Sequence, residues 1–167
     1  MRNTLLLVVG VCVFSVSGIA WTAAQQARPA SPDAASMDDV LRAVRSDLQG
    51  TRADIMAKNL TLTADQAAKF WPAYSKFQAE QGTIVDAQLA AMQKYVTSYG
   101  SIDDAKALEY TNANLARDQQ MFELRSKWLK EFQKILPARI AARVIQIDRR
   151  LGIAHQLFLS SQLPLIY

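Results

Sequence analysis

Apolar side chains recur every three or four residues over most of the chain beyond residue 36, and this spacing is typical of amphipathic α-helices. Few residues interrupt the pattern, because the 167-residue chain has only six glycines and five prolines. That is too few for an all-β fold, which needs a turn roughly every 8–12 residues. No stretch of alternating apolar and polar residues is long enough for a useful strand. The sequence therefore predicts an all-α fold of about four helices.

The first two helices are predicted from their capping residues. Ser36, followed by acidic residues, is expected to start the first helix, which ends near Leu60 and is weakened in its middle by Gly50. The second helix is expected to begin at Thr63. Pro72 falls inside the second helix, removes a backbone hydrogen bond and is expected to kink the first turns.

The third helix is expected to follow Gly100, with Ser101 as its cap and acidic residues behind the cap. It carries apolar residues at strict seven-residue intervals, which are Leu108, Leu115, Phe122, Leu129 and Leu136. The residues four positions after the ladder residues are polar. This disfavours a long coiled coil and favours a helix that packs on one side within a small bundle. Pro137 comes directly afterwards and is expected to be the first residue of a fourth helix.

The composition divides the chain into four segments. Its beginning has a positive residue, an uncharged apolar run and then small residues, which is the pattern of a cleaved secretory signal peptide. An uncleaved membrane anchor is the alternative, because the apolar run could just span a bilayer. The predicted segments are a signal peptide at 1–24, with cleavage after Ala20 as a second option, a flexible linker at 25–36, a helical domain at 37–162 and an apolar, packed tail at 163–167.

The residue types present argue against catalytic and metal chemistry. One Cys and one His cannot form a His/Cys metal cluster or a disulfide within the chain. The single histidine, His155, stands among apolar residues and is interpreted as a packed or surface residue. The sequence has no Gly-rich phosphate loop and no G-x-S-x-G elbow. We therefore expect no enzyme activity, no cofactor and no bound metal.

The segment Leu62-Thr63-Ala64-Asp65-Gln66 has the form of a capping box. The Thr63 hydroxyl can accept a hydrogen bond from the backbone N–H of Gln66, and the Gln66 side chain can reach back to the N–H of Thr63. By itself this pattern indicates a well-built helix start with no chemistry of its own.

The same segment resembles the LTxxQ motif of the Spy/CpxP family of periplasmic proteins, and Leu62, Thr63 and Gln66 are the matching residues. The stretch Phe70-Trp71-Pro72-x-Tyr74 and the stretch from Leu136 to Asp148 are also similar to a branch of that family. The likeness covers roughly residues 60–167, together with the signal peptide.

The second motif copy that is usual in the family is degenerate here. Leu136-Pro137 stands where Leu-Thr is expected, and Ile140 occupies the Gln position. The resemblance implies an all-helical fold with a long kinked helical hairpin and an antiparallel, cradle-shaped homodimer. It also implies a periplasmic location and activity as an ATP-independent chaperone or envelope-stress modulator.

Basic residues concentrate between Arg125 and Arg150, where eight Lys and Arg are opposed by only two acidic residues, a net charge of +6. The segment is interpreted either as a solvated basic face or as a surface that attracts acidic chains and then holds their apolar parts. The candidate client-binding residues are Trp128, Lys130, Phe132, Lys134, Arg139, Ile140 and Arg143. Export disfavours nucleic acid as a partner, and peripheral contact with an anionic membrane is a further alternative.

These observations and the family resemblance together predict a periplasmic, ATP-independent chaperone or envelope-stress modulator that binds unfolded or envelope proteins. The alternative is a regulatory module that binds the sensor domain of an envelope stress signalling kinase, without general chaperone activity.

Overall fold

The computed structural model describes residues 39, 42–43 and 50–167. Across this part of the chain the regular elements are all helical and no strand is present, which confirms the expected all-α fold of about four helices. The elements are α2 (Thr51–Asn59), α3 (Ala64–Ser98), the short 3₁₀ helix η1 (Tyr99–Ser101), α4 (Asp104–Gln133) and α5 (Ala138–Ser161). The predicted signal peptide, the linker and most of the N-terminal half of the first helix lie outside the described residues.

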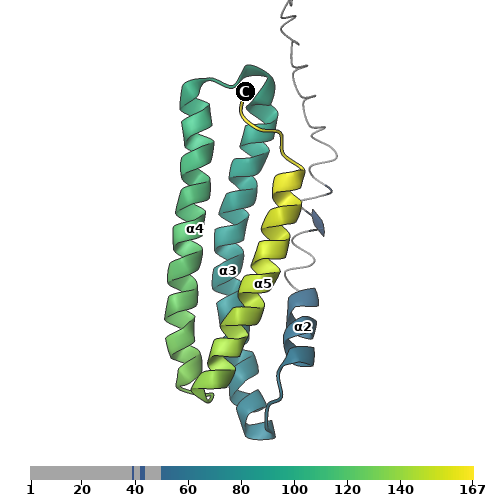
Figure 1. Ribbon diagram of the computed structural model, residues 1–167, viewed down its shortest axis with the longest axis vertical. Coiled ribbons are helices and arrows are strands. Elements are labelled where there is room, and N and C mark those ends of the chain that lie inside the picture. The colour runs from purple at the N-terminus through teal and green to yellow at the C-terminus, as the bar shows by residue number, and fades with distance from the viewer. Residues whose placement is uncertain (1–38, 40–41, 44–49) are drawn as a thin grey trace, which may run out of the picture.

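The long helices run antiparallel in sequence order (Figure 1). The chain passes along α3, turns through η1, returns along α4 and turns again into α5, which runs back beside α3. Helix α2 packs against α5, beside the lower part of the bundle in Figure 1. α3 and α4 share the most extensive contact, so the hairpin of these two helices is the frame on which α5 and α2 are placed.

The capping box at the start of α3 is formed as the sequence predicts. Thr63 has extended backbone angles, and its Oγ1 accepts from the backbone N–H of Gln66 at 3.3 Å. The Gln66 Oε1 accepts in return from the N–H of Thr63 at 3.1 Å. The helix continues without interruption through Pro72 to Ser98, and the bend expected at Pro72 stays a prediction.

The predicted cap of α4 is wrong by two residues. Residues 99–101 form η1, so Ser101 belongs to a 3₁₀ turn and its hydroxyl donates back to the carbonyl of Ser98. Asp103 is the cap instead, because its extended backbone lets its Oδ1 accept from the N–H of Lys106 at 2.9 Å.

The connection between α4 and α5 also differs from the expectation. α4 ends at Gln133, and a short turn separates it from Pro137, which is the N-cap of α5 rather than its first helical residue. The turn is closed by the N–H of Leu136, which donates to the carbonyl of Phe132 at 2.8 Å. The carbonyl of Pro137 accepts the first hydrogen bonds of α5.

The core of the lower part of the bundle is a cluster of aromatic rings contributed by α3 and α4. Ring centroids lie 5.6 Å apart for Phe70 and Phe132 and 5.9 Å apart for Phe77 and Trp128. These large rings bury a large apolar area and favour the tilted and edge contacts seen here, so the cluster holds the hairpin together at this end.

The seven-residue ladder packs only at its lower end, where Leu129 contacts the core and Leu136 is buried. Leu108, Leu115 and Phe122 are 62%, 63% and 71% exposed. The residues of α4 that are buried form a different stripe, which comprises Met121, Leu124, Trp128 and Phe132. The aromatic stripe buries more apolar area against α3 than the ladder could, and the helix is rotated accordingly.

The apolar tail packs against the upper end of α3. The hydroxyl of Tyr95 donates to the carbonyl of Pro164 at 2.9 Å, and the hydroxyl of Tyr99 donates to the carbonyl of Leu165 at 3.0 Å. The hydroxyl of Tyr167 donates to the carbonyl of Tyr99 at 3.0 Å. The tail backbone is therefore fixed near η1 (Figure 1), while the side chain of Leu165 is exposed.

Candidate functional site

An open groove of ≈ 930 Å³ lies between α4 and α5. The two helices meet at the turn between residues 133 and 138 and diverge from it (Figure 1). The apolar residues that line the groove are Met121, Phe122, Leu129, Ile145, Ile153 and Leu157. Its walls are therefore built from both helices, and its occupant would contact residues distant in the sequence.

Several of these apolar side chains face solvent. Phe122 and Leu157 are each 71% exposed, and Ile153 is 56% exposed. Scattered exposed apolar residues are ordinary on a protein surface, whereas a contiguous set in a hollow is typical of an interaction site. We call this set of lining residues the α4–α5 groove.

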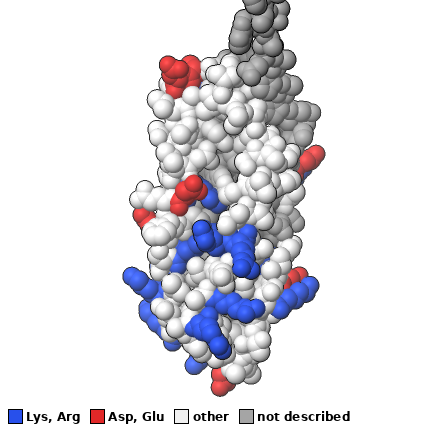
Figure 2. Space-filling view, viewed as in Figure 1, with Lys and Arg blue, Asp and Glu red and all other residues white. Residues whose placement is uncertain are grey.

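The groove has a basic margin. Arg117, Arg125 and Arg149 line it, with Asp118 as the acidic residue of its lining. Figure 2 shows Lys and Arg side chains gathered over the lower half of this face, where α4 and α5 come together. The groove therefore combines apolar contact area with positive charge at its edges.

Two of the three arginines are held in place by ion pairs. Arg117 Nη1 lies 2.7 Å from Asp118 Oδ1, and Arg125 Nε lies 2.8 Å from Asp148 Oδ2. Gly152 leaves room for the Arg125 guanidinium, because a Cβ at residue 152 would lie 2.8 Å from Arg125 Nη2. A side chain larger than hydrogen at position 152 would force the Arg125 guanidinium to move.

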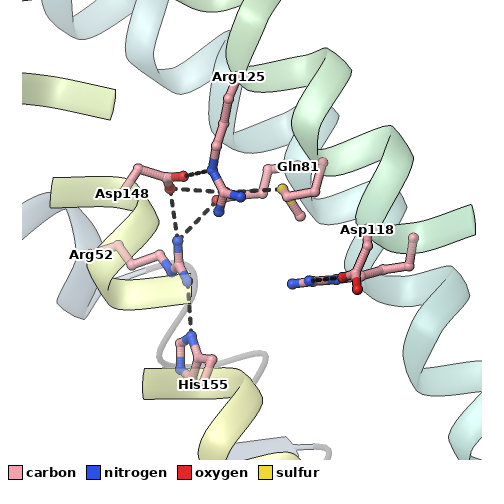
Figure 3. Close-up of polar contacts among 8 residues, drawn as sticks. Arg52, Gln81, Asp118, Arg125, Asp148 and His155 are labelled. Atoms are coloured by element: carbon pink, nitrogen blue, oxygen red, sulfur yellow. Dashed lines mark hydrogen bonds and ion pairs between the residues drawn. The ribbon is translucent and has the colours of Figure 1, made fainter. Parts of the chain in front are cut away.

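A buried polar network lies beneath the groove (Figure 3). The carboxylate of Asp148 accepts at Oδ1 from Arg52 Nη1 and from Gln81 Nε2, both at 2.9 Å, and at Oδ2 from Arg125. Asp148 is fully buried and Arg52 is 3% exposed. Helices α2, α3, α4 and α5 each contribute one side chain, so this network joins these four helices at a single point.

The network also affects a neighbouring tyrosine. Burial raises the pKa of the Tyr74 hydroxyl far above its usual value of 10.0, and the negative charge of Asp148 raises the pKa further. The Tyr74 hydroxyl therefore stays protonated and uncharged throughout the physiological pH range.

The structure corrects the predicted client-binding surface. Phe132 is fully buried and Trp128 is 6% exposed, with its indole N–H donating to Glu80 Oε2 at 3.0 Å. The prediction that these two rings contact a client is wrong, because they form the core between α3 and α4. Lys130 and Lys134 are exposed at the same end of α4, and Lys134 pairs with Glu131 at 2.7 Å.

The remaining predicted surface residues are brought together by the fold. Arg139, Ile140 and Arg143 line a second open depression of ≈ 770 Å³ between α5 and the segment after α2. Arg143 Nε donates to the carbonyl of Asn59 at 2.9 Å, which joins the two sides. This depression is more polar than the α4–α5 groove and has a single large apolar side chain from α5.

The motif residues Leu62, Thr63 and Gln66 serve as a helix start. Leu62 is half-buried against the core, and Thr63 and Gln66 are occupied by the capping box. They lie outside the α4–α5 groove.

Sequence reasoning missed Arg52, Asp148 and the α5 side of the groove. A signal for Asp148 exists, because it interrupts the apolar stripe of α5 one turn after Val144. Nothing local distinguishes Arg52 from any exposed arginine. Its partner Asp148 is 96 residues away in the sequence.

Two further features are absent from the described residues. Among residues 39, 42–43 and 50–167, no group of three or more His, Cys, Asp or Glu side chains is placed to hold a metal ion. None of the helices in that same part has the length and apolar character required to cross a membrane.

Comparison of the chain with known protein families, with curated proteins and with solved structures found no match.

Proposed function

We propose that this protein binds apolar segments of other proteins in the α4–α5 groove, as a periplasmic, ATP-independent chaperone or envelope-stress modulator of the Spy/CpxP type. The observation that carries the proposal is the groove itself, in which exposed apolar side chains from two helices are bordered by arginines. The predicted signal peptide and the LTxxQ-like segment in the sequence support the same class of protein.

The shape of the groove suits an amphipathic segment. Two antiparallel helices that diverge over a third leave room for one more helix or an extended chain, and such grooves bind through apolar anchors spaced along the ligand. Phe122 and Leu129 lie on one wall, and Ile153 and Leu157 lie on the other. An occupant would therefore be held from both sides by aliphatic and aromatic contact.

The charge of the groove selects among such segments. Arg149 is exposed, and Asp118 is the acidic residue among the described side chains that line the groove. Positive charge around an apolar site accelerates the capture of segments that carry acidic residues and makes the capture rate sensitive to salt. The expected client is an unfolded or partly folded chain with acidic residues beside its apolar ones.

The proposal is tested with an aggregation assay in the absence of nucleotide. The purified protein should slow the aggregation of a chemically denatured client, and a Phe122→Ser/Leu157→Ser double variant should lose most of this effect. Leu165→Ser is the matched control, because Leu165 is an even more exposed apolar residue at the far end of the molecule, outside the groove. Absence of suppression at several-fold molar excess, or equal loss in the control, would refute the proposal.

A regulatory module is the second candidate, in which the groove binds the sensor domain of an envelope stress signalling kinase and no other clients. The observation that favours it is the fixed position of Arg117 and Arg125, since preorganised charges suit one complementary partner better than many. Recovery of one stoichiometric envelope partner from unstressed cells, without suppression of aggregation in vitro, would support this candidate over the first.

We also propose that the protein forms a homodimer. The exposed ladder residues Leu108 and Leu115 extend the apolar surface of α4 beyond the groove, and a second copy would cover them through a self-complementary contact. Light scattering should give twice the chain mass, and Leu108→Glu/Leu115→Glu should give the monomer mass. A monomer at high concentration for the unsubstituted protein would contradict the dimer.

A further inference from the structure

Helix α5 carries a row of basic side chains on the face that points away from the bundle. Arg139, Arg143 and Arg150 follow one another at intervals of four and seven residues, which places them on one face of a helix. All three are exposed. The buried residues of α5, such as Val144 and Asp148, lie on the opposite face. We call the three arginines the α5 basic row.

The charge of the α5 basic row is not neutralised by the described residues. Arg139 and Arg150 form no ion pair or side-chain hydrogen bond with any of them. Arg143 donates through Nε to the backbone carbonyl of Asn59 at 2.9 Å, and this neutral acceptor leaves the positive charge in place. The one acidic residue of α5 is Asp148, which is fully buried. The exposed surface of α5 is therefore purely basic.

The N-terminal end of α5 adds to this positive potential. The first turn of α5 contains no acidic residue, and the backbone N–H groups of a first helical turn carry a partial positive charge. Arg139 lies in that turn, and Lys130 is exposed at the adjoining end of α4. Figure 2 shows Lys and Arg side chains gathered over this lower part of the molecule.

The depression of ≈ 770 Å³ beside the row has room for a phosphate group. Arg139 and Arg143 line it, together with Gln146 and residues 59–61. A guanidinium suits a phosphate because its planar fork of N–H donors matches two phosphate oxygens. This depression shares no lining residue with the α4–α5 groove, so an occupant here does not take the place of one in the groove.

The residues of this face favour a lipid surface over a protein as the partner. Stable protein interfaces have an apolar centre in which aromatic residues are enriched. Here Ala142 and Gln146 are the exposed residues between the first arginines, so the face offers charge with little apolar area. An anionic bilayer needs only charge, because each Lys or Arg close to its surface adds to the attraction. The row extends over about 16 Å of helix axis, which lets all three arginines reach a planar surface together.

We propose that the α5 basic row docks the protein on the surface of an anionic phospholipid bilayer, with lipid phosphates bound at Arg139 and Arg143. The contact is peripheral and electrostatic, and it uses none of the residues that line the α4–α5 groove. The inference goes beyond the binding of clients in the groove and does not depend on it.

Sedimentation with lipid vesicles tests the docking. The full chain, purified after export, should sediment at low salt with vesicles of phosphatidylcholine and phosphatidylglycerol, and should stay in solution with phosphatidylcholine alone. Each arginine near an anionic surface contributes about fivefold to the partition constant, so Arg139→Gln/Arg150→Gln should weaken the binding about 25-fold. High salt should release the protein, because it shortens the range of the attraction.

Two matched variants separate charge at this face from charge in general. Lys69→Gln/Lys76→Gln removes the same charge from exposed side chains of α3, and it should leave the binding nearly unchanged. Arg139→Lys/Arg150→Lys keeps the charge and should bind as the unsubstituted protein does. Equal binding to the neutral vesicles, or an equal loss in the α3 variant, would overturn the proposal. Retention by polyglutamate but not by anionic vesicles would also overturn it, and would assign the row to acidic proteins instead.

Discussion

Asp148 is the carboxylate on which the arginines of two helices converge, and replacement of Asp148 by asparagine removes its charge while nearly preserving its shape. Asp148 is completely buried, and it lies 2.9 Å from Arg52 and 2.8 Å from Arg125. The asparagine side chain would keep one oxygen for Arg52 and Gln81. Its amide nitrogen would take the place of Oδ2 and would point a donor at the donor Nε of Arg125.

The expected cost follows from these contacts. Loss of a hydrogen bond to a charged group costs about 1.5–3 kcal/mol, and removal of one partner of a buried ion pair costs about 3–5 kcal/mol, because the other charge is left uncompensated. Arg52 is enclosed and must bear this penalty, whereas the side chain of Arg125 is 18% exposed and can turn toward water. We therefore expect Asp148→Asn to lower the free energy of unfolding by about 3 kcal/mol, the lower end of the range.

Urea denaturation followed by far-ultraviolet circular dichroism measures this difference. The matched control is Glu109→Gln, which removes an ion pair to Lys94 in which both side chains are more than half exposed. The control should change the unfolding free energy by less than about 1 kcal/mol. If Asp148→Asn costs no more than the control, Asp148 does not hold the four helices together and the account of the buried network is wrong.

Three further predictions follow from the cap, the tail and one exposed carboxylate. Thr63→Ala should lower the unfolding free energy by about 1 kcal/mol through loss of the helix cap, whereas Thr61→Ala, outside the helix, should leave it unchanged in the same urea titration. Burial raises the pKa of Tyr95 from 10.0 to about 12, so the free energy of unfolding should fall as the pH rises through that interval. Tyr95→Phe should weaken this dependence on alkaline pH, and it should expose the tail to digestion by carboxypeptidase. The hydrogen bond from Lys127 lowers the pKa of Glu80 below 4.5, so Glu80→Gln should destabilise the protein at neutral pH, and the difference in melting temperature should disappear as acid protonates Glu80.

Local signals in the sequence were sufficient to predict the helices of the described residues, the end of α2 at Leu60 and the start of α3 at Thr63. The capping box at Thr63 involves residues three apart, so its geometry could be predicted without the fold. The start of α4 was missed because Ser101 and Asp103 are both good caps, and the 3₁₀ turn that chooses between them depends on how Tyr99 is buried beside the tail.

The candidate site was predictable in kind but not in position. Mixed basic and apolar character was visible between residues 125 and 150, yet Trp128 and Phe132 are buried and Phe122 is exposed. Trp128 and Phe132 lie on one apolar stripe of α4 and Phe122 lies on another, and periodicity by itself could not rank the two stripes. The choice depends on which rings of α3 they meet, and this information lies some tens of residues away in the chain.

The sequence by itself determined that the chain is helical, where α3 begins and that basic and apolar residues are mixed near the C-terminal end, because these properties depend on residues within one or two turns of each other. Only the tertiary structure decided which stripe of α4 is buried, that α4 and α5 diverge into a groove, and that Arg52 meets Asp148 and His155. The physical reason is that helix rotation is set by the total apolar area buried between elements, and that a buried charge is retained only where distant helices supply its partner.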